Sequence, residues 1–327
     1  MRKPTYFDYF RPADMGDLSR KMREFSPNIV MDDFDVQHTI KGRSSGKVKY
    51  STSLFIENHD ITDPEMNLLG ITSLPLHSKN ETDAFLIQNG WSKKSRSWWD
   101  TYLRPICQFN DPYVNLEVYT CPWLFHQLEK SGMLNGNHTY HVMSSPSVRH
   151  NPGAMWRFKG LDSDMPVFIV DADALDTERP GIDQWLRSKA KWWRAAHNGA
   201  NELNSFDNRS VFYHPITASQ FGCIGGVVSD DIITEQMKVF YWAASMGLVQ
   251  NEVWHPGIEK SCPIFGRSPS GYGFDEVFCA QVLFPQMLKD GLFSVFPPRD
   301  RRSTFGQLDL EMCQALHPSS GNETVVI

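Results

Sequence analysis

Apolar and polar residues follow two different periods along this chain, and from residue 48 onward the two periods alternate. Short stretches rich in β-forming residues predict strands over 50–56, 114–119, 138–143, 165–170 and 293–296. Apolar residues spaced three and four apart predict helices over 97–107, 122–130, 153–161, 181–190, 230–246 and 275–289. Strands and helices that alternate in this way are typical of an α/β protein whose mostly parallel sheet is flanked by helices.

The segment 230–246 has the clearest helical pattern in the chain. Ser229 can accept a hydrogen bond from the first turn, and Asp230 and Asp231 complement the positive end of the helix dipole. Gly247 follows the last apolar position, where glycine commonly ends a helix. We therefore expect a helix that is capped at its start by Ser229 and ends before Gly247.

The pattern divides the chain into three regions. Residues 1–47 mix charged and aromatic residues without clear periodicity, and we interpret them as an N-terminal extension or a peripheral element. Residues 48–300 contain all of the predicted strands and helices, and they form the predicted α/β domain. Residues 301–327 contain no predicted element, and we interpret them as a C-terminal tail.

The composition narrows the class of protein. The net charge of −6 argues against general nucleic-acid binding, which favours a basic surface. No apolar stretch approaches the roughly 20 residues that span a membrane, and Met1 to Asp14 lack the apolar core of a secretory signal. The six cysteines are spread without a C-x-x-C pair, which is typical of free thiols in a reducing compartment. These features predict a cytoplasmic protein without a membrane span.

Two carboxylates follow the most apolar of the predicted strands. Val167 to Val170 is apolar without alternation, which is typical of a strand that is buried on both faces. Asp171 and Asp173 come next, and on extended backbone the side chains of residues i and i+2 point the same way. Since a buried strand cannot hold two ionised carboxylates, both must lie beyond its carboxyl end, where ligands bind in open α/β sheets.

A divalent cation would relieve the repulsion between these two carboxylates. Mg²⁺ and Mn²⁺ prefer oxygen ligands and are commonly shared between protein carboxylates and substrate phosphates. A metal held by Asp171 and Asp173 would neutralise a diphosphate and stabilise it as a leaving group. The alternative is that the two aspartates merely begin a loop and cap the next helix, because aspartate is common at such places.

The order of several motifs resembles one group of GT-A-fold glycosyltransferase-like proteins, which occurs in large viruses and microbes. In that group an Arg-Phe segment precedes a strand that ends in an acidic motif, and a glutamate, a tryptophan-containing helix, a glycine-rich segment and an Asp-Gln-x-Phe helix follow. The matching residues here are Met155-Trp156-Arg157-Phe158, Asp171-Ala172-Asp173, Glu178, Trp185, Gly222 to Gly226, Asp275-Glu276-Val277-Phe278 and Phe284-Pro285.

The resemblance covers about residues 50–297 and departs from the group at two positions. Val170 stands where the group has arginine, and Glu276 stands where it has glutamine. The resemblance implies a GT-A fold, a Rossmann-like and mostly parallel central sheet. It also implies a metal-dependent hexosyl- or pentosyltransferase that moves a sugar from a nucleotide-sugar donor to a glycan or small-molecule acceptor. If the chain is viral, the compartment would be the host cytoplasm.

The resemblance also suggests roles for residues outside the acidic pair. Arg157 would hold the donor diphosphate or order the acidic pair, since a guanidinium suits both, whereas a surface arginine is the plain alternative. Gly225 and Gly226 would let the backbone approach the donor sugar, and the plain alternative, which is compatible with this role, is a tight turn between a strand and the helix 230–246. The remaining suggested residues belong to the acceptor and metal sites.

For the acceptor and metal sites, structural explanations of the same residues are also open. Asp275, together with Glu276, would act as a general base or as a ligand for acceptor hydroxyls, although acidic residues are also expected at a helix start. His255 would complete the metal site with Asp171 and Asp173, although a single loop histidine is usually incidental.

Two other classes of protein share parts of this pattern. Phosphoryl-transfer enzymes of the haloacid-dehalogenase type also use a strand that ends in D-x-D. They require threonine or valine two residues after the second aspartate, where this chain has Leu175. A non-catalytic binding or structural protein that retains the GT-A fold is consistent with the departures at Val170 and Glu276.

Overall fold

The chain forms two compact units, each made of segments that are discontinuous in sequence. A computed structural model describes residues 12–56, 73–89, 91, 97–144, 153–175, 192–195, 221–223, 232–249, 274–283, 285–286 and 292–295. Unit 1 comprises Met1–Ile29, Glu178–Gly225 and Glu235–Ile327, and unit 2 comprises Val30–Thr177 and Gly226–Thr234.

Unit 2 is built on a mixed, mostly parallel sheet, which confirms the predicted α/β class. Its strands are β1 (Val36–Ile40), β2 (Val48–Leu54), β3 (Val114–Thr120), β4 (Thr139–Met143) and β5 (Val167–Ile169). They lie in the order β1-β4-β3-β2-β5. The neighbours β4, β3, β2 and β5 are parallel, and β1 pairs antiparallel with β4 at the edge.

The strand order reverses between β2 and β5. From β2 the chain builds outward through β3 to β4, and it then returns to place β5 on the other side of β2. In open α/β sheets such a reversal separates the connections at the carboxyl ends of the two strands, and ligands bind in the resulting crevice. The carboxyl ends of β2 and β5 are therefore the favoured place for a ligand in unit 2.

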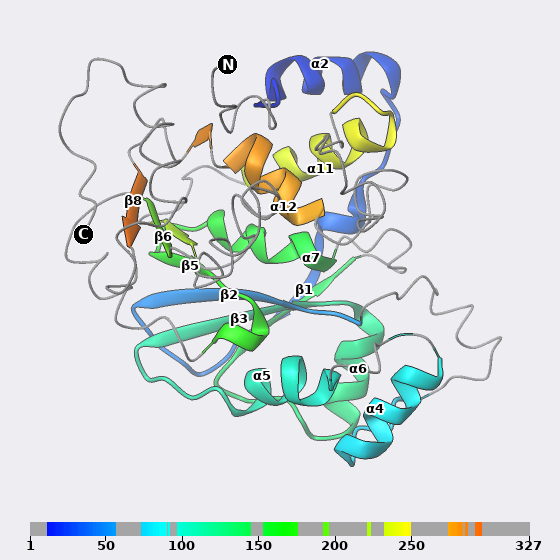
Figure 1. Cartoon of the computed structure of the whole chain (residues 1–327), viewed down its shortest axis with the longest axis vertical. Helices are drawn as coiled ribbons and strands as arrows, with labels where there is room; N and C mark the ends of the chain where they lie inside the picture. Colours follow the sequence, from blue (N-terminus) through cyan, green and yellow to red (C-terminus); the bar gives the residue numbers. More distant parts are fainter. Residues whose placement is uncertain are drawn as a thin grey trace, which may run out of the picture. The chain divides into compact units, whose positions relative to one another are not determined.

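Helical segments cover both faces of this sheet (Figure 1). One face carries α4 (Lys79–Gln88), the π-helical turn η2 (Trp99–Leu103), α5 (Arg104–Gln108) and α6 (Pro122–Lys130). The other face carries α7 (Gly153–Trp156), which continues directly into the 3₁₀ turn η3 (Arg157–Leu161). Two further 3₁₀ turns are η1 (Asp32–Phe34) and η4 (Ala172–Ala174).

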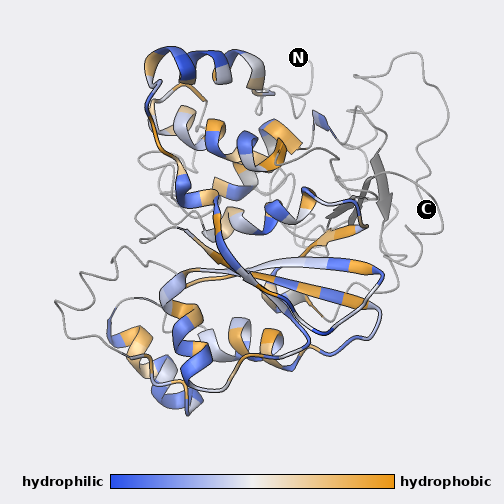
Figure 2. Cartoon of the chain, turned by 180° about the vertical axis from the view of Figure 1, so that it is seen from behind, coloured by the Kyte–Doolittle hydropathy of each residue, from blue (hydrophilic) through white to orange (hydrophobic). Residues whose placement is uncertain are grey.

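The two faces of the sheet differ in polarity, because side chains alternate along each strand. Tyr50 points to the face of α5, where its ring packs 5.8 Å from that of Phe109, and it also packs 5.3 Å from the ring of Phe168. The next residue, Ser51, points to the opposite face and hydrogen-bonds to η3. Figure 2 shows hydrophilic and hydrophobic residues following one another along these strands. The face under α7 and η3 is thus polar, although it is buried.

Most predicted elements of unit 2 are confirmed, with shifts of a few residues at their ends. The predicted helix 122–130 matches α6, which ends at Lys130, and Gly132 follows with a φ of 67° that suits glycine. The predicted helix 153–161 is divided between α7 and η3. The pattern did not predict α4 or the edge strand β1.

Unit 1 contains a second group of strands and the later helices. Its elements are α2 (Met15–Phe25), β6 (Trp192–Ala195), β7 (Phe221–Cys223), most of α11 (Ile232–Ser245), α12 (Phe274–Phe278), the π-helical turn η6 (Cys279–Leu283) and β8 (Leu292–Val295). Strand β6 pairs antiparallel with β7 and parallel with β8. The ring of Phe240 on α11 packs 5.5 Å from Phe274 and 5.4 Å from Phe278, so these aromatic residues join α11 to α12.

Two predictions for unit 1 can be compared with the structure only in part. The predicted helix 230–246 corresponds to α11, and Gly247 follows it with a φ of 67°. Ser229 and the two aspartates expected at its start lie outside the described residues, as does the predicted helix 181–190.

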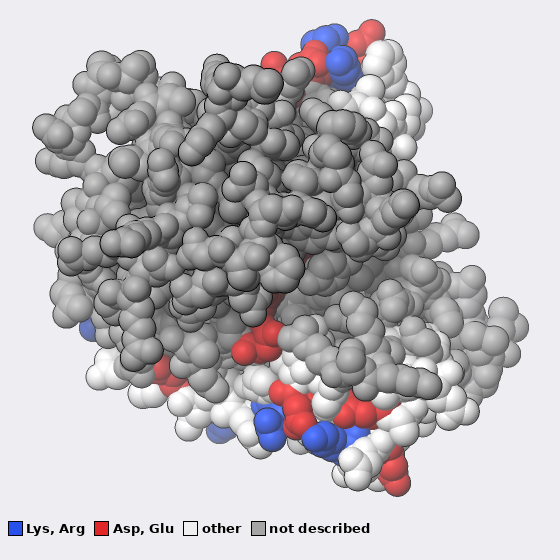
Figure 3. Space-filling view, in the orientation of Figure 1, with Lys and Arg blue, Asp and Glu red and all other residues white. Residues whose placement is uncertain are grey.

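Acidic and basic side chains are intermixed on the described surface in Figure 3, at α2 and around α4 and α5. Asp100, for example, forms ion pairs with both Lys79 and Arg104. Within the described segments, no helix is long and apolar enough to cross a membrane. The thiols of Cys107, Cys121 and Cys279 are free, as predicted for these cysteines, and burial raises the pKa of Cys107 to about 11.

Candidate functional site

The candidate site lies where β5 ends beside β2. The side chains of Val167 to Val170 are 0% exposed, which confirms the prediction of a strand buried on both faces. Asp171 is the first residue beyond this apolar run, and 41% of its side chain is exposed. A carboxylate therefore stands at the boundary between the core and solvent, at the end of the sheet where the strand order reverses.

Arg157 holds Asp171 from the neighbouring helical segment. Its Nη1 atom donates a hydrogen bond to Oδ1 of Asp171 and forms an ion pair with it. The Arg157 side chain is only 7% exposed, and its guanidinium carbon lies 5.6 Å from the centre of the Phe158 ring. The interpretation of Arg157 as a surface residue is therefore wrong, because its charge is buried and directed at the acidic motif.

Asp173 has a different backbone environment from Asp171. Asp171 is extended, with φ −72° and ψ 148°, but Ala172 to Ala174 form the 3₁₀ turn η4. The expectation that one extended backbone carries both carboxylates on the same side is therefore wrong. Asp173 is exposed at the surface of this turn. Over the described part of the chain, no cluster of three or more His, Cys, Asp and Glu side chains is arranged to hold a metal ion.

The other predicted site residues are distributed differently. Asp275 lies in α12 of unit 1 and is 7% exposed, and Glu276 follows it in the same helix. Gly225, Gly226 and His255 lie outside the described residues. Among the described residues predicted for the site, the contact that the structure defines is the one between Arg157 and Asp171.

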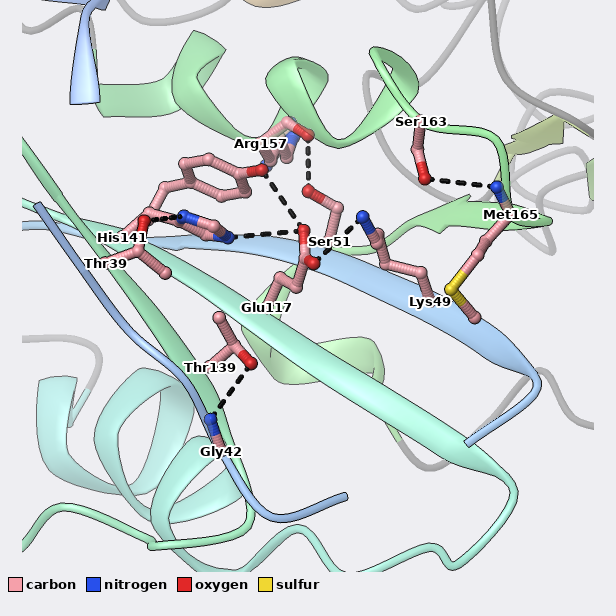
Figure 4. Close-up of polar contacts among 11 residues, drawn as sticks. Thr39, Gly42, Lys49, Ser51, Glu117, Thr139, His141, Arg157, Ser163 and Met165 are labelled. Carbon is pink, nitrogen blue, oxygen red and sulfur yellow. Dashed lines mark hydrogen bonds and ion pairs between the residues drawn. The ribbon is translucent and has the colours of Figure 1, made fainter. Parts of the chain in front are cut away.

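A buried polar network on the sheet face beneath η3 was not anticipated from the sequence (Figure 4). Glu117 is at its centre: Oε1 lies 2.9 Å from Nζ of Lys49, and Oε2 lies 3.4 Å from Nε2 of His141. The Tyr119 hydroxyl donates to Oε2 of Glu117 at 3.2 Å, and Oγ1 of Thr39 lies 2.9 Å from Nδ1 of His141. The network thus links three strands, β2, β3 and β4, to the edge strand β1.

The charges in this network determine the protonation of its members. Desolvation raises the pKa of Glu117, but the hydrogen bond and charge of His141 and the charge of Lys49 outweigh it, so that its pKa lies below the ordinary value. Burial raises the pKa of Tyr119 well above its ordinary value, and the charge of Glu117 and the hydrogen bond to it raise the pKa further. Glu117 is therefore an anion that accepts a hydrogen bond from a neutral tyrosine.

The sequence contains a signal for this network that could have been read. Ser51 and Ser53 alternate with less polar positions in the predicted strand 50–56, with Lys49 directly before it, and Glu117 and Tyr119 alternate in the same way in the predicted strand 114–119. Because residues i and i+2 share a face of a strand, two such strands side by side predict a polar face. Which helix covers that face cannot be read from the pattern.

Asp162 caps the start of α11. Its Oδ1 accepts a hydrogen bond from the amide of Ile233 at 2.9 Å, and its Oδ2 accepts from the amide of Thr234 at 3.1 Å. The Thr234 hydroxyl donates to the same oxygen at 2.9 Å and accepts from Nζ of Lys159 at 2.6 Å. Two of the free amides at this end of α11 are therefore satisfied by a residue about 70 positions earlier in the chain.

Replacing Asp162 by alanine is expected to lower the free energy of unfolding by about 1–2 kcal/mol, because the cap is lost. Burial raises the pKa of Asp162, and the hydrogen bonds from Ile233 and Thr234 offset this only in part. The folded protein therefore binds the proton more tightly than the unfolded chain, and this residue's contribution to stability falls as the pH rises from its ordinary pKa of 3.8 through the raised value.

Urea unfolding of wild type and Asp162→Asn across that pH range measures this contribution. As the pH rises, the free energy of unfolding of the wild type should fall relative to that of Asp162→Asn, because asparagine does not titrate. A difference that stays constant would contradict the assignment.

Comparisons with known protein families, with curated proteins and with solved structures find no match to this chain.

Proposed function

We propose that this protein is a metal-dependent glycosyltransferase that moves a sugar from a nucleotide-sugar donor to a hydroxyl group of a glycan or small-molecule acceptor. One observation carries the proposal. Asp171 lies at the carboxyl end of β5, beside the reversal of strand order between β2 and β5, and a second carboxylate follows two residues later. This is the position at which open α/β sheets bind ligands, and nucleotides are common among them.

The groups at this position suit a divalent cation and a diphosphate. Oδ1 of Asp171 is occupied by Arg157, which leaves Oδ2 of its partly exposed carboxylate to join Asp173 in holding Mn²⁺ or Mg²⁺. The bound cation would supply charge stabilisation for the departing nucleoside diphosphate. Arg157 keeps the Asp171 carboxylate oriented, so the proposed catalysis depends mainly on positioning and electrostatics.

The acceptor side of the proposal rests on the resemblance. Asp275 would remove the proton from the attacking hydroxyl, assisted by Glu276, while Gly225 and Gly226 would lie against the donor sugar and His255 would complete the metal site. General-base catalysis of this kind contributes about 10²–10⁴-fold to a rate, so an Asp275→Asn variant should lose activity on that scale while still binding the donor.

Thermal unfolding in the presence of nucleoside diphosphates and nucleotide-sugars, with and without Mn²⁺, tests the donor site. A ligand at a hundred times its dissociation constant stabilises the native state by about 2.7 kcal/mol, so a matching nucleotide should raise Tm by several degrees only when Mn²⁺ is present. We expect Asp173→Asn to lose this rise. Asp164 is an exposed acidic residue at the opposite end of β5, and Asp164→Asn should keep the rise.

The alternative is a non-catalytic protein of the same fold, and one observation favours it. Arg157 already compensates the charge of Asp171, which weakens the attraction of this carboxylate for a cation. Metal-dependent nucleotide binding without sugar transfer or donor hydrolysis would support this alternative. No rise in Tm with any nucleotide in the presence of Mn²⁺ would contradict the donor site and favour the non-catalytic alternative, with the acidic motif as a feature of the loop.

A further inference from the structure

Two serine hydroxyls of β2 hold the backbone of Arg157. The amide of Arg157 donates to Oγ of Ser53 at 2.9 Å, and Oγ of Ser51 donates to the carbonyl oxygen of Arg157 at 2.5 Å. Both serines are buried, and because they are two residues apart on a strand they share the face that η3 covers. The two polar groups of one peptide residue are thus bound by two neighbouring side chains of the sheet.

Glycines allow this segment to lie directly on the strand. A side-chain carbon at Gly160 would overlap the Ser51 side chain, and one at Gly153 would overlap the ring of Phe55. Both ends of the segment 153–161 therefore approach β2 more closely than any other residue would permit. This close approach brings the Arg157 backbone within reach of short serine side chains.

The polar network beneath η3 lies beside Ser51 on the same sheet. Ser51 of β2 pairs in register with Glu117 of β3, which accepts from Tyr119, forms an ion pair with Lys49 and lies 3.4 Å from Nε2 of His141 (Figure 4). Glu117 thus has three polar neighbours, Lys49, Tyr119 and His141, and these contacts restrain its buried carboxylate. Ser51 itself is 0% exposed, and its one donor is used in the hydrogen bond to the Arg157 carbonyl oxygen.

We infer that Ser51 and Ser53 are positioning residues for the proposed donor site. They fix the backbone of Arg157, and the Arg157 guanidinium fixes the carboxylate of Asp171 at the carboxyl end of β5. The inference rests on the proposed function in one respect, namely that Asp171 helps to bind the cation. Groups that orient a metal ligand without touching the metal commonly change metal affinity by about 10–100-fold when they are removed.

The test uses Ser51→Ala and Ser53→Ala in the full chain, with Thr39→Val as the matched control. Thr39 also presents a hydroxyl to the network, but it contacts His141 and not Arg157. The first readout is the dissociation constant for Mn²⁺. The second is the NMR signal of the Arg157 Nε–H group, which is assigned by its absence from an Arg157→Lys variant and which responds to the pairing of the guanidinium.

We expect the two serine variants to shift or broaden the Arg157 signal and to bind Mn²⁺ up to about tenfold more weakly, the lower end of the range for a direct partner of a metal ligand, whereas Thr39→Val should change neither readout. If an alanine variant does not fold, the cysteine variant at the same position replaces it, because cysteine keeps the volume but is a weak hydrogen-bonding group. Ser53→Thr, which retains the hydroxyl, should restore both readouts.

Two outcomes would overturn the inference, and they differ from a failure of the proposed function. Folded serine variants that keep both the wild-type Arg157 signal and the wild-type Mn²⁺ affinity would show that the serines only stabilise the fold. Changes of equal size in both readouts for Thr39→Val would also show that the serines only stabilise the fold. If the wild type does not bind Mn²⁺, the proposed function fails, and the Arg157 signal alone then decides whether the serines position this side chain.

Discussion

Replacing Glu117 by leucine is expected to lower the free energy of unfolding by about 3 kcal/mol, because it leaves the Lys49 ammonium in the sheet without its anion. The Lys49 and His141 side chains are only 15% and 16% exposed, so water replaces the lost carboxylate poorly. Breaking a buried ion pair by removing one partner typically costs about 3–5 kcal/mol, and the partial exposure of Lys49 and His141 places this case at the lower end.

Urea unfolding measures this loss, and a double-mutant cycle tests its cause. Lys49→Met should recover part of the stability in the Glu117→Leu background, because it removes the stranded charge. Glu129 is a matched control: its side chain is 57% exposed on α6, and Glu129→Leu should change stability by no more than about 0.5 kcal/mol. Additive losses in the cycle would contradict the assignment of Glu117 as the common partner.

Replacing Asp171 by alanine is expected to cost more stability than replacing its partner Arg157 by methionine. Without Asp171 the guanidinium, which is 7% exposed, loses its carboxylate in a place that water reaches poorly. Without Arg157 the Asp171 carboxylate, which is 41% exposed, is hydrated by solvent, and methionine fills much of the vacated volume. We expect losses of about 2–3 kcal/mol for Asp171→Ala and about 1 kcal/mol for Arg157→Met.

Urea unfolding of both variants, with Asp171→Asn as an intermediate, measures this asymmetry. Asparagine keeps an acceptor for Nη1 of Arg157, so Asp171→Asn should lower the free energy of unfolding less than Asp171→Ala does. Equal losses for Asp171→Ala and Arg157→Met would mean that the burial of the Arg157 guanidinium does not affect the free energy of unfolding. They would also contradict the interpretation of Arg157 as a buried support of the acidic motif.

Residues that are close together in the sequence determined several elements of this fold. The apolar run Val167 to Val170 has no polar position, so only a strand buried on both faces can accommodate it. Pro122 at the first position of α6 and Gly132 after its end specify a helix by backbone chemistry alone. In each case the residues that decide the structure are close together in the chain, and the α/β class follows from their alternation.

The position of the first site carboxylate was also readable from the sequence, but the local geometry of the second was not. A charged residue that follows a buried strand must lie beyond its end, and Asp171 does. Whether the chain stays extended through Asp173 depends on what packs around it, and the structure contains the turn η4 instead.

Only the tertiary structure decided which distant groups meet. The serines that hold Arg157 are 104 and 106 residues away from it, the cap of α11 comes from Asp162, and the edge strand β1 is defined by pairing with β4. The sequence around one partner does not identify the other, because a hydroxyl, a carboxylate or a free strand edge can bind many different groups. The alternation of residues along β2 and β3 therefore predicts a polar face of the sheet. Only the tertiary structure brings that face into contact with Arg157, and Arg157 into contact with Asp171.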